Sequence, residues 1–258
     1  MKTRYPIYIV SKGRWENPIT AKSMIKEGID FRIVIEPQEL ELYKRTIPEK
    51  NLLITDFSNL GLGSYPARNF AWEDSIKNGH EWHYLFDDNI YGIYRLHKGK
   101  KRRDSWTKAI HWLDEFTDRY SNVAISGFNY EMFATRGTQK PFVVNHHVYS
   151  GMRIKNSLKF RWRLKYNEDV DLCLNALDRG YCTIQFNAFL IDKVSTTAKL
   201  KGGNQDELYK GNAHEKKVLK ARSLEEIWPK YAETKMRFNR PHHYVDWKKH
   251  FKHGLIKK

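Results

Sequence analysis

The sequence has few cysteines and no long hydrophobic segment. Its 258 residues include only two cysteines, Cys173 and Cys182, which argues against a disulfide framework or a four-ligand zinc site and is typical of a reducing compartment. A run of about eighteen apolar residues, which would span a membrane, is absent, and residues 1–6 lead directly into a strand-like segment. We therefore expect no membrane span, no signal peptide, no membrane partner and a cytoplasmic location.

Acidic residues are fewer than basic residues. The chain has 30 Asp and Glu against 46 Lys and Arg, a formal net charge of +16. Such an excess favours polyanionic partners, with nucleic acid as the leading candidate, although basic surfaces also occur for solubility alone. Hydrophobic residues make up 40% and aromatic residues 14% of the chain. The sequence therefore predicts a globular protein with one large domain and an appendage.

Strand-like and helix-like segments alternate along the first three quarters of the chain. Apolar runs predict strands at 5–10, 31–35, 52–54, 82–87, 123–127 and 183–191. Helical spacing or turn signals predict helices at 19–27, 37–45, 67–76, 106–120 and 167–179. This alternation predicts a parallel, three-layer α/β sheet. Between these elements we expect a basic loop at 98–103 and a pair of strands at 142–144 and 148–154.

An acidic cluster, Asp87-Asp88-Asn89, follows the apolar strand at 82–86. Ligands of open α/β sheets bind at the carboxyl ends of the strands, and oxygen ligands there suit Mg²⁺ or Mn²⁺ holding a phosphorylated substrate. Asp and Asn are also common in plain turns because they bond to their own backbone. These residues alone leave both interpretations open.

A second acidic motif, Asn167-Glu168-Asp169, begins a predicted helix. Carboxylates in a first turn lie near the positive end of the helix dipole, and ordinary capping with Asn167 as the N-cap explains them as well as function does. In a functional interpretation, Asp169 is a general base aimed at a nucleophilic hydroxyl. The two acidic motifs together favour function more strongly than either motif alone.

Taken in order, these motifs resemble those of the GT-A glycosyltransferases. The resemblance covers about residues 5–195 and rests on Ser11 to Arg14, Glu36, Gly61, Ala67-Arg68-Asn69, Asp87-Asp88-Asn89, and Arg161-Trp162-Arg163 before Asn167-Glu168-Asp169. Within that superfamily the chain looks most like the phage glycosyltransferases associated with TET/JBP-type base hydroxylases. The resemblance implies a Rossmann-like, three-layer α/β sandwich with a mostly parallel central sheet and a basic C-terminal extension. For a phage protein the location would be the host cytoplasm.

The resemblance also implies roles for individual residues. The nucleotide-sugar donor, expected to be a UDP-sugar, would be bound by Ser11, Arg14, Glu36, Arg68, Asn69 and Asp87. A divalent metal, Mn or Mg, would be held by Asp87, Asp88 and Asn89, with His214 as an added ligand. Asn89 departs from the usual Asp-x-Asp pattern, and an uncharged amide binds a cation more weakly. Asp169, with Glu168 beside it, would be the base of an inverting single displacement.

The last part of the chain has a different composition. We expect a catalytic domain at 1–195 and a C-terminal segment at 196–258, which begins with a mobile loop near 201–204 and continues with interleaved basic and aromatic residues. Such a segment can contact DNA phosphates and stack on bases, but it is also typical of an amphipathic helix packed on the domain. The histidines His146, His147, His242 and His243 more often have structural or surface roles.

The leading hypothesis is a nucleotide-sugar-dependent glycosyltransferase acting on DNA that carries a hydroxymethylated pyrimidine, with 5-hydroxymethylcytosine as the expected acceptor. One alternative is a GT-A transferase whose acceptor is a polysaccharide, a protein or a small molecule. Another is a catalytically idle DNA-binding relative.

Overall fold

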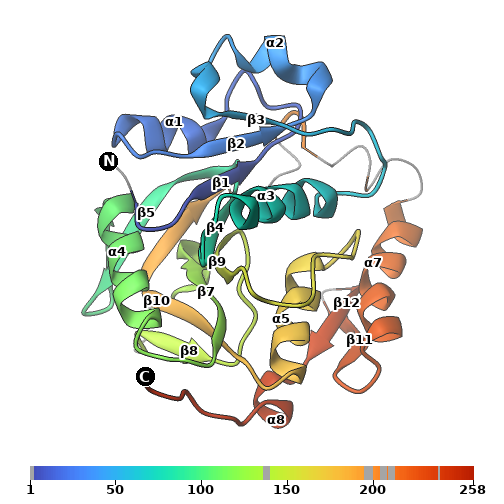
Figure 1. The fold of residues 1–258 in the computed structure, drawn as a ribbon. Helices are drawn as coiled ribbons and strands as arrows, with labels where there is room; N and C mark the ends of the chain where they lie inside the picture. The colour runs from blue at the N-terminus through green and yellow to red at the C-terminus, as the bar shows by residue number, and fades with distance from the viewer. Residues whose placement is uncertain (1–2, 136–139, 195–199, 204–207, 209–212, 238) are drawn as a thin grey trace.

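The protein folds around one large mixed sheet covered by helices on both faces (Figure 1). The computed structural model describes residues 3–135, 140–194, 200–203, 208, 213–237 and 239–258. The strands of the main sheet are β1 (Ile7–Val10), β2 (Arg32–Ile35), β3 (Leu52–Ile54), β4 (Trp82–Asp87), β5 (Ile90–His97), β6 (Lys100–Asp104), β7 (Val123–Tyr130), β8 (Phe142–Val144), β9 (Gly151–Lys155) and β10 (Cys182–Lys193).

The sheet has the strand order β3-β2-β1-β4-β9-β7-β10-β5-β6, and β8 pairs with β10. Strands β1 to β4 are mutually parallel, as are β7 and β10. Strand β9 lies antiparallel between β4 and β7, so β1, β2, β3, β4, β7 and β10 all run in the same direction. Their carboxyl ends therefore lie along one edge of the sheet, where ligands of such folds bind.

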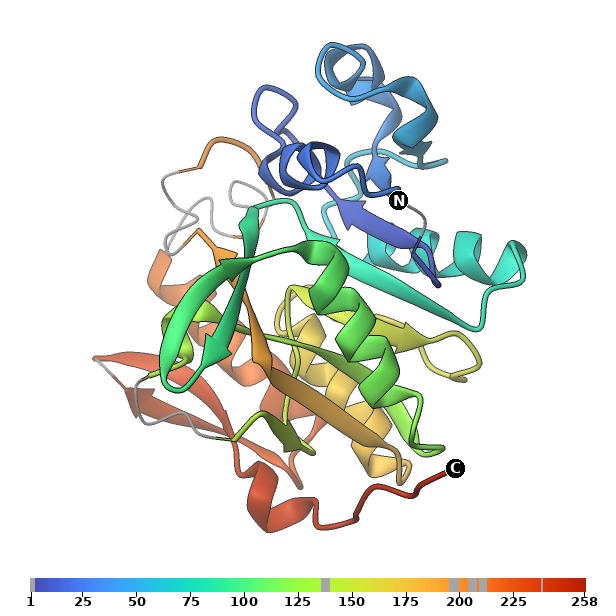
Figure 2. The same ribbon diagram turned by 90° about the vertical axis from the view of Figure 1, so that its left-hand side faces the viewer.

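Helices are distributed over both faces of this sheet. They are α1 (Ile19–Lys26), α2 (Leu40–Tyr43), α3 (Tyr65–Lys77), α4 (Trp106–Thr117), α5 (Glu168–Asp178), α7 (Ala213–Ile227) and α8 (Trp247–His250), with short 3₁₀ turns η1 (Pro37–Glu39), η2 (Glu49–Asn51) and η3 (Glu131–Phe133). Helices α1, α2 and α4 contribute to the core on one face, and α3 and α5 to the core on the other. Figure 2 shows α4 packed across its face of the sheet.

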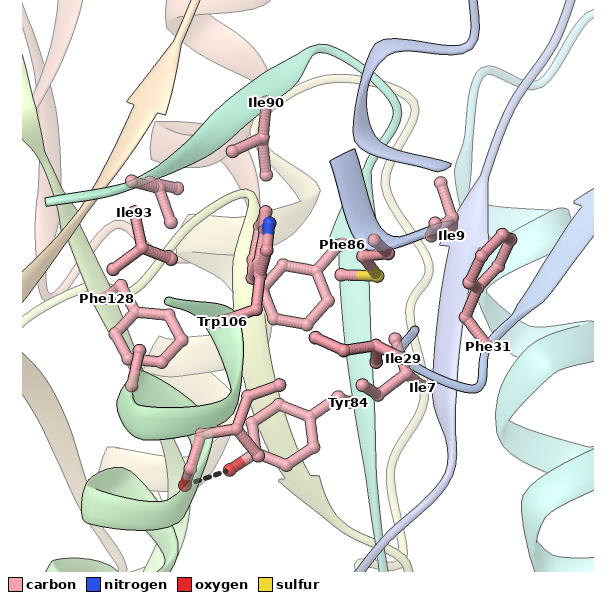
Figure 3. Packing of buried hydrophobic residues seen from close by; sticks show 14 of the residues in the cluster. Ile7, Ile9, Ile29, Phe31, Tyr84, Phe86, Ile90, Ile93, Trp106 and Phe128 are labelled. Atoms are coloured by element: carbon pink, nitrogen blue, oxygen red, sulfur yellow. Dashed lines mark hydrogen bonds between the residues drawn. The ribbon is translucent and has the colours of Figure 1, made fainter. Parts of the chain in front are cut away.

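Alternation along the strands builds the two cores. In β4, Tyr84 and Phe86 point into the core under α1 and α4, while Leu85 points into the core under α3 and α5, as the two-residue period of a strand requires. The ring of Phe86 meets Trp106 of α4 edge to face, with centroids 5.2 Å apart (Figure 3). Ser105 is the N-cap of helix α4, and its hydroxyl accepts from the backbone N–H of Lys108 at 3.2 Å.

The C-terminal segment packs on the outer side of α5. A small apolar cluster joins Val170, Leu174 and Leu177 of α5 to Leu224 of α7 and to the two-stranded hairpin β11 (Ala232–Arg237) and β12 (Arg240–Val245). Asn204 and Phe238, which the sequence placed in the loop and the aromatic tail, lie outside the described residues. The domain division at residue 195 stays a prediction.

The predicted fold is confirmed, a three-layer α/β sandwich with a mostly parallel sheet, but two local predictions are wrong. The basic segment at 98–103 is not a loop, since Lys100–Asp104 forms strand β6 and pairs with β5. The segments at 142–144 and 148–154 do not pair with each other. Instead β8 pairs with β10, and β9 pairs with β4 and β7. Among the described residues, no helix is both long and apolar enough to cross a membrane.

Candidate active site

Three adjoining cavities follow the carboxyl-terminal edge of the sheet. The first, of about 20 Å³, opens where β1 and β2 end. The second, of about 180 Å³, lies over the end of β4, and the third, of about 290 Å³, lies between β4, β10 and the start of α5. Four residues line both the second and the third cavity: Arg68, Asp87, Glu168 and Lys193. The edge of the sheet at which the site was predicted therefore contains cavities, and the second and third of them meet at Asp87.

The first cavity contains Ser11 and Glu36, each directly after a strand. Glu36 accepts from the backbone N–H of Asn59 at 2.9 Å, from the Gln38 amide at 2.6 Å and from Lys12 Nζ at 2.9 Å. Burial alone would raise the pKa of Glu36, but these three donors outweigh it and lower the pKa. Glu36 is therefore a fixed anion at the cavity wall.

In the second cavity, Asp88 is held by the loop after β1. The hydroxyl of Ser11 donates to Asp88 at 2.6 Å, and Arg14 forms an ion pair with the same carboxylate. Burial raises the pKa of Asp88 in spite of the Arg14 charge. The segment 200–203 returns over this loop, and the N–H of Gly203 donates to the carbonyl of Lys12 at 2.6 Å.

Asp87, at the end of β4, lies between two cations. Arg68 donates to its Oδ1 at 2.8 Å, whereas Lys193 and Ser150 donate to its Oδ2 at 2.6 and 2.7 Å. Although burial would raise the pKa of Asp87, the adjacent Lys193 and Arg68 charges hold it well below its usual range. Asp87 is therefore ionised at any physiological pH.

Arg68 of α3 connects Asp87 to the second acidic motif. Its Nε donates to Ser64 Oγ at 2.9 Å, and its Nη2 lies 3.6 Å from Glu168 Oε1. The guanidinium also lies over the ring of Trp162, 4.9 Å from its centroid, an arrangement that fixes a planar cation. A side chain held from four directions is preorganised before any ligand binds.

The third cavity contains Asp169 at the first turn of α5. Asn167 has left-handed backbone geometry (φ 55°), and its side chain does not cap the helix but donates to the carbonyl of Lys220 in α7 at 2.5 Å. Glu168 and Asp169 therefore face the cavity from a turn that the C-terminal segment holds. Burial raises the pKa of both carboxyl groups, and Arg68 only partly offsets it. Asp169 Oδ1 accepts a hydrogen bond from the backbone N–H of Val170 at 2.9 Å.

The structure brings most of the predicted site residues together. Ser11, Arg14, Glu36, Arg68, Asp87, Asp88, Asn89, Glu168 and Asp169 each line at least one of the three cavities. Asn69 does not, because its amide donates to the Trp162 carbonyl at 2.8 Å and accepts from the Trp162 N–H at 3.1 Å. His214 lies in α7, but its side chain is outside the described part of the structure.

Several cavity residues were missed by the sequence reasoning. They come from the ends of β7 and β10, from the turn before β9 and from the C-terminal segment, and are Tyr130, His147, Ser150, Lys193, Lys220 and His243. A signal did exist for Lys193, since it follows a predicted strand that ends at the same edge of the sheet as β4. Burial lowers the pKa of His243 to about 4, so this side chain is neutral at pH 7.

The acidic cluster does not fit a divalent metal ion as it is arranged. All four carboxylate oxygens of Asp87 and Asp88 accept hydrogen bonds from protein donors. Within the Asp87-Asp88-Asn89 cluster, the one side-chain oxygen without a hydrogen-bond partner among the described residues is the buried Oδ1 of Asn89, whereas Mg²⁺ and Mn²⁺ require several oxygen ligands. In the described part of the chain, no group of three or more His, Cys, Asp or Glu side chains could hold a metal ion.

Comparisons with known proteins give one weakly similar solved structure and one matching family. A crystal structure of a protein from Desulfovibrio desulfuricans G20, whose name assigns it to the nucleotide-diphospho-sugar transferases, aligns with a TM-score of 0.44 and 10% identity, over 86% of this chain and 90% of that one. A search of curated proteins found no match. The family model of the TET-Associated Glycosyltransferases matches residues 5–203. The chain therefore belongs to the TET-associated glycosyltransferase family.

Proposed function

We propose that this glycosyltransferase moves a sugar from a UDP-sugar onto the hydroxyl of 5-hydroxymethylcytosine in DNA, in the course of phage DNA modification. One observation carries the proposal. The second and third cavities meet at Asp87, Arg68 and Lys193, with Asp169 on the far side. A donor in one cavity and an acceptor in the other would then meet at a fixed cluster of charges.

The second cavity, of about 180 Å³, suits the diphosphate, and the first, which at about 20 Å³ has room for about one water molecule, marks where the nucleoside would have to enter. In this proposal Glu36 and Ser11 bind the nucleoside, while Arg14 and Arg68 face the diphosphate. A guanidinium matches phosphate oxygens in a two-pronged geometry, and Arg68 is already fixed by Ser64 and Trp162. Positioning of this kind supplies much of the rate of group transfer.

The third cavity suits the acceptor. Asp169 would take the proton from the acceptor hydroxyl while the oxygen of that hydroxyl forms a bond to the anomeric carbon. The bond from that carbon to the diphosphate oxygen breaks, the nucleoside diphosphate leaves with the electron pair, and the configuration inverts. A base works best when its pKa approaches the working pH, and burial moves the pKa of Asp169 in that direction. Glu168, next to Asp169 in the chain, would position Arg68 and Ser64 through its contacts with both side chains.

The β11–β12 hairpin supports DNA as the acceptor. Arg237 and Arg240 are exposed at its turn, and His243 of the same hairpin lines the third cavity. A strand rises about 3.3 Å per residue, so Arg240 is about 10 Å along the strand from the cavity. Phosphates flanking a base in the third cavity would therefore lie within reach of these arginines. The net charge of +16 adds long-range attraction.

The test is transfer itself. The protein is incubated with unmodified, hydroxymethylcytosine and hydroxymethyluracil DNA and a panel of nucleotide sugars, and the digested nucleosides are analysed by mass spectrometry. We expect a hexose or pentose mass gain on hydroxymethylcytosine with a UDP-sugar. No gain on any hydroxymethylated DNA would refute the proposal, and a gain on hydroxymethyluracil alone would change the acceptor.

A salt titration tests the DNA surface separately. The double variant Arg237→Ala/Arg240→Ala should reduce the slope of log affinity against log salt by about 2 if both residues contact phosphates. The double variant Lys108→Ala/Arg119→Ala, on and beside α4, is the matched control and should leave the slope unchanged. Equal slopes for both double variants would exclude the hairpin as a phosphate contact.

A further inference from the structure

The acidic cluster at the end of β4 contains its own cations. We propose that Arg68 and Lys193 together take the position and the charge of a divalent metal ion beside Asp87, so that donor binding and sugar transfer need no added metal. The inference rests on the proposed function, because it concerns the leaving diphosphate of that reaction. It departs from the metal site that the sequence predicts for Asp87, Asp88 and Asn89.

The first support is the way in which the two cations flank one carboxylate. Arg68 Nη2 lies 2.8 Å from Asp87 Oδ1, and Lys193 Nζ lies 2.6 Å from Oδ2. The two oxygens on which a metal would be held are therefore occupied, one by each cation. Two monovalent charges at these positions equal the charge of one divalent ion.

The second support is that Lys193 is fixed. Its ammonium group donates to Asp87 Oδ2 and Ser150 Oγ at 2.6 Å each and to the Tyr130 hydroxyl at 3.2 Å. An ammonium group has three N–H donors, and all three are engaged. Lys193 therefore acts on a neighbouring diphosphate through its charge, held in place at no reorganisation cost during the reaction.

The third support is the charge balance of the two cavities. Among the described residues that line them, five side chains are cationic and four are carboxylates, namely Lys12, Arg14, Arg68, Lys193 and Lys220 against Asp87, Asp88, Glu168 and Asp169. Mg²⁺ is commonly bound through one or two carboxylates together with substrate phosphates, and here both carboxylates of the acidic cluster are already paired with cations. Here the fixed cations already outnumber the carboxylates, and the incoming diphosphate supplies the remaining negative charge.

The experiment measures nucleotide binding by calorimetry, with uridine, guanosine, adenosine, cytidine and thymidine diphosphates as probes. Wild-type protein, Lys193→Met and Lys193→Arg are compared in EDTA and in millimolar Mn²⁺. Lys155→Met is the matched control, because Lys155 lies at the opposite end of the sheet, where it pairs in register with Trp82 at the start of β4. Circular dichroism verifies that each variant is folded.

We expect the wild type and Lys155→Met to bind one of these nucleotides equally well with and without metal. Lys193→Met should bind it at least tenfold more weakly in EDTA, and Mn²⁺ should restore part of that affinity, since the substitution removes the cation from Asp87 Oδ2 and leaves Ser150 as a neutral donor there. Lys193→Arg, which keeps the charge, should lose less. The same pattern is expected for transfer in EDTA, with a loss of about 10²- to 10³-fold for Lys193→Met, as for removal of one fixed charge from a transition state.

Three outcomes would overturn the inference. Loss of wild-type binding in EDTA that Mn²⁺ reverses would restore the metal site, and equal binding by Lys193→Met and the wild type would remove Lys193 from it. If Lys193→Met does not fold, Lys193→Arg decides the question. The inference would also be refuted if Lys193→Arg bound the nucleotide as well as the wild type only when Mn²⁺ is present. Absence of binding by the wild type under every condition would instead refute the proposed function.

Discussion

Glu39 provides a test of the electrostatics of this edge that needs no substrate. It lies in η1, behind the loop that follows β1, and its Oε1 accepts from the backbone N–H of Gly13 at 2.8 Å. The other oxygen, Oε2, is buried and has no partner among the described residues. Burial raises the pKa of Glu39 from its ordinary 4.5 to about 7, and the Gly13 bond only partly offsets this effect. We predict that Glu39→Gln stabilises the protein above pH 7.

The sign and size follow from proton linkage. Below pH 4.5 Glu39 is protonated in both the folded and the unfolded chain, so its burial as a charged group does not lower the free energy of unfolding. As the pH rises toward 7, the unfolded chain releases the proton first, and stability is lost. The difference between 4.5 and about 7, at about 1.4 kcal/mol for each tenfold change in proton affinity, amounts to about 3 kcal/mol above pH 7. Gln resembles the protonated form and avoids that cost.

The assay is urea unfolding followed by tryptophan fluorescence at pH 4 and pH 8. Glu39→Gln should gain up to about 3 kcal/mol at pH 8 and close to nothing at pH 4. Glu36→Gln is the matched control, because donors lower the pKa of Glu36. Its contribution is present above the unfolded pKa and is lost as the pH falls, so this variant should be less stable at pH 8. A Glu39→Gln effect of equal size at both pH values would refute the reasoning.

Three further changes test other parts of the structure. Asp169→Asn should lower the turnover number by about 10²- to 10⁴-fold and leave nucleotide affinity unchanged in calorimetry. In the wild type, kcat/KM should fall as the pH is lowered, with an apparent pKa above that of an ordinary aspartate, since burial raises the pKa of Asp169. Gly202→Ala should weaken nucleotide binding, because Gly202 has φ 76° and an added Cβ would collide with the carbonyl of Gly13; unchanged affinity would contradict this. Arg153→Met should destabilise the fold by about 3 kcal/mol in urea unfolding, since it leaves the carboxylates of Asp114 and Asp118 without their buried cation.

The alternation of strands and helices was predictable because each element carries its own period. The order of the strands was less so, as β9 shows. The segments at 142–144 and 148–154 resemble a local hairpin, yet β9 inserts between β4 and β7, far from both in sequence. No local pattern specifies such a pairing. The β5–β6 hairpin did have a signal in Gly99, since a two-residue turn between strands requires positive φ, and both Lys98 and Gly99 have it in the structure.

The site was predictable as far as one rule reaches. Parallel strands end at one edge, and this rule pointed to the acidic cluster at Asp87, whereas Ser11 and Glu36 were selected through the resemblance to the GT-A glycosyltransferases. The same rule points to Lys193, which ends β10 at that edge, but nothing else in the sequence separates it from the other Lys and Arg residues, 46 in all. Its importance arises from the pairing of β10 with β7, which brings it to Asp87. The role of Asn69 could not be judged without the neighbouring backbone of Trp162.

The distribution of cations among the buried carboxylates favours one assignment of chemical roles. Arg68 and Lys193 are bonded to Asp87 and lower its pKa, whereas Asp169 accepts a hydrogen bond from the backbone N–H of Val170, and burial raises its pKa. Carboxylates whose pKa values are pushed apart by their surroundings commonly divide the work of a reaction. A permanently ionised Asp87 can order the cations that face the diphosphate but cannot serve as a useful base. Asp169, at the same sheet edge, accepts a proton more readily, so the chemistry of the acceptor hydroxyl is expected on its side of the site.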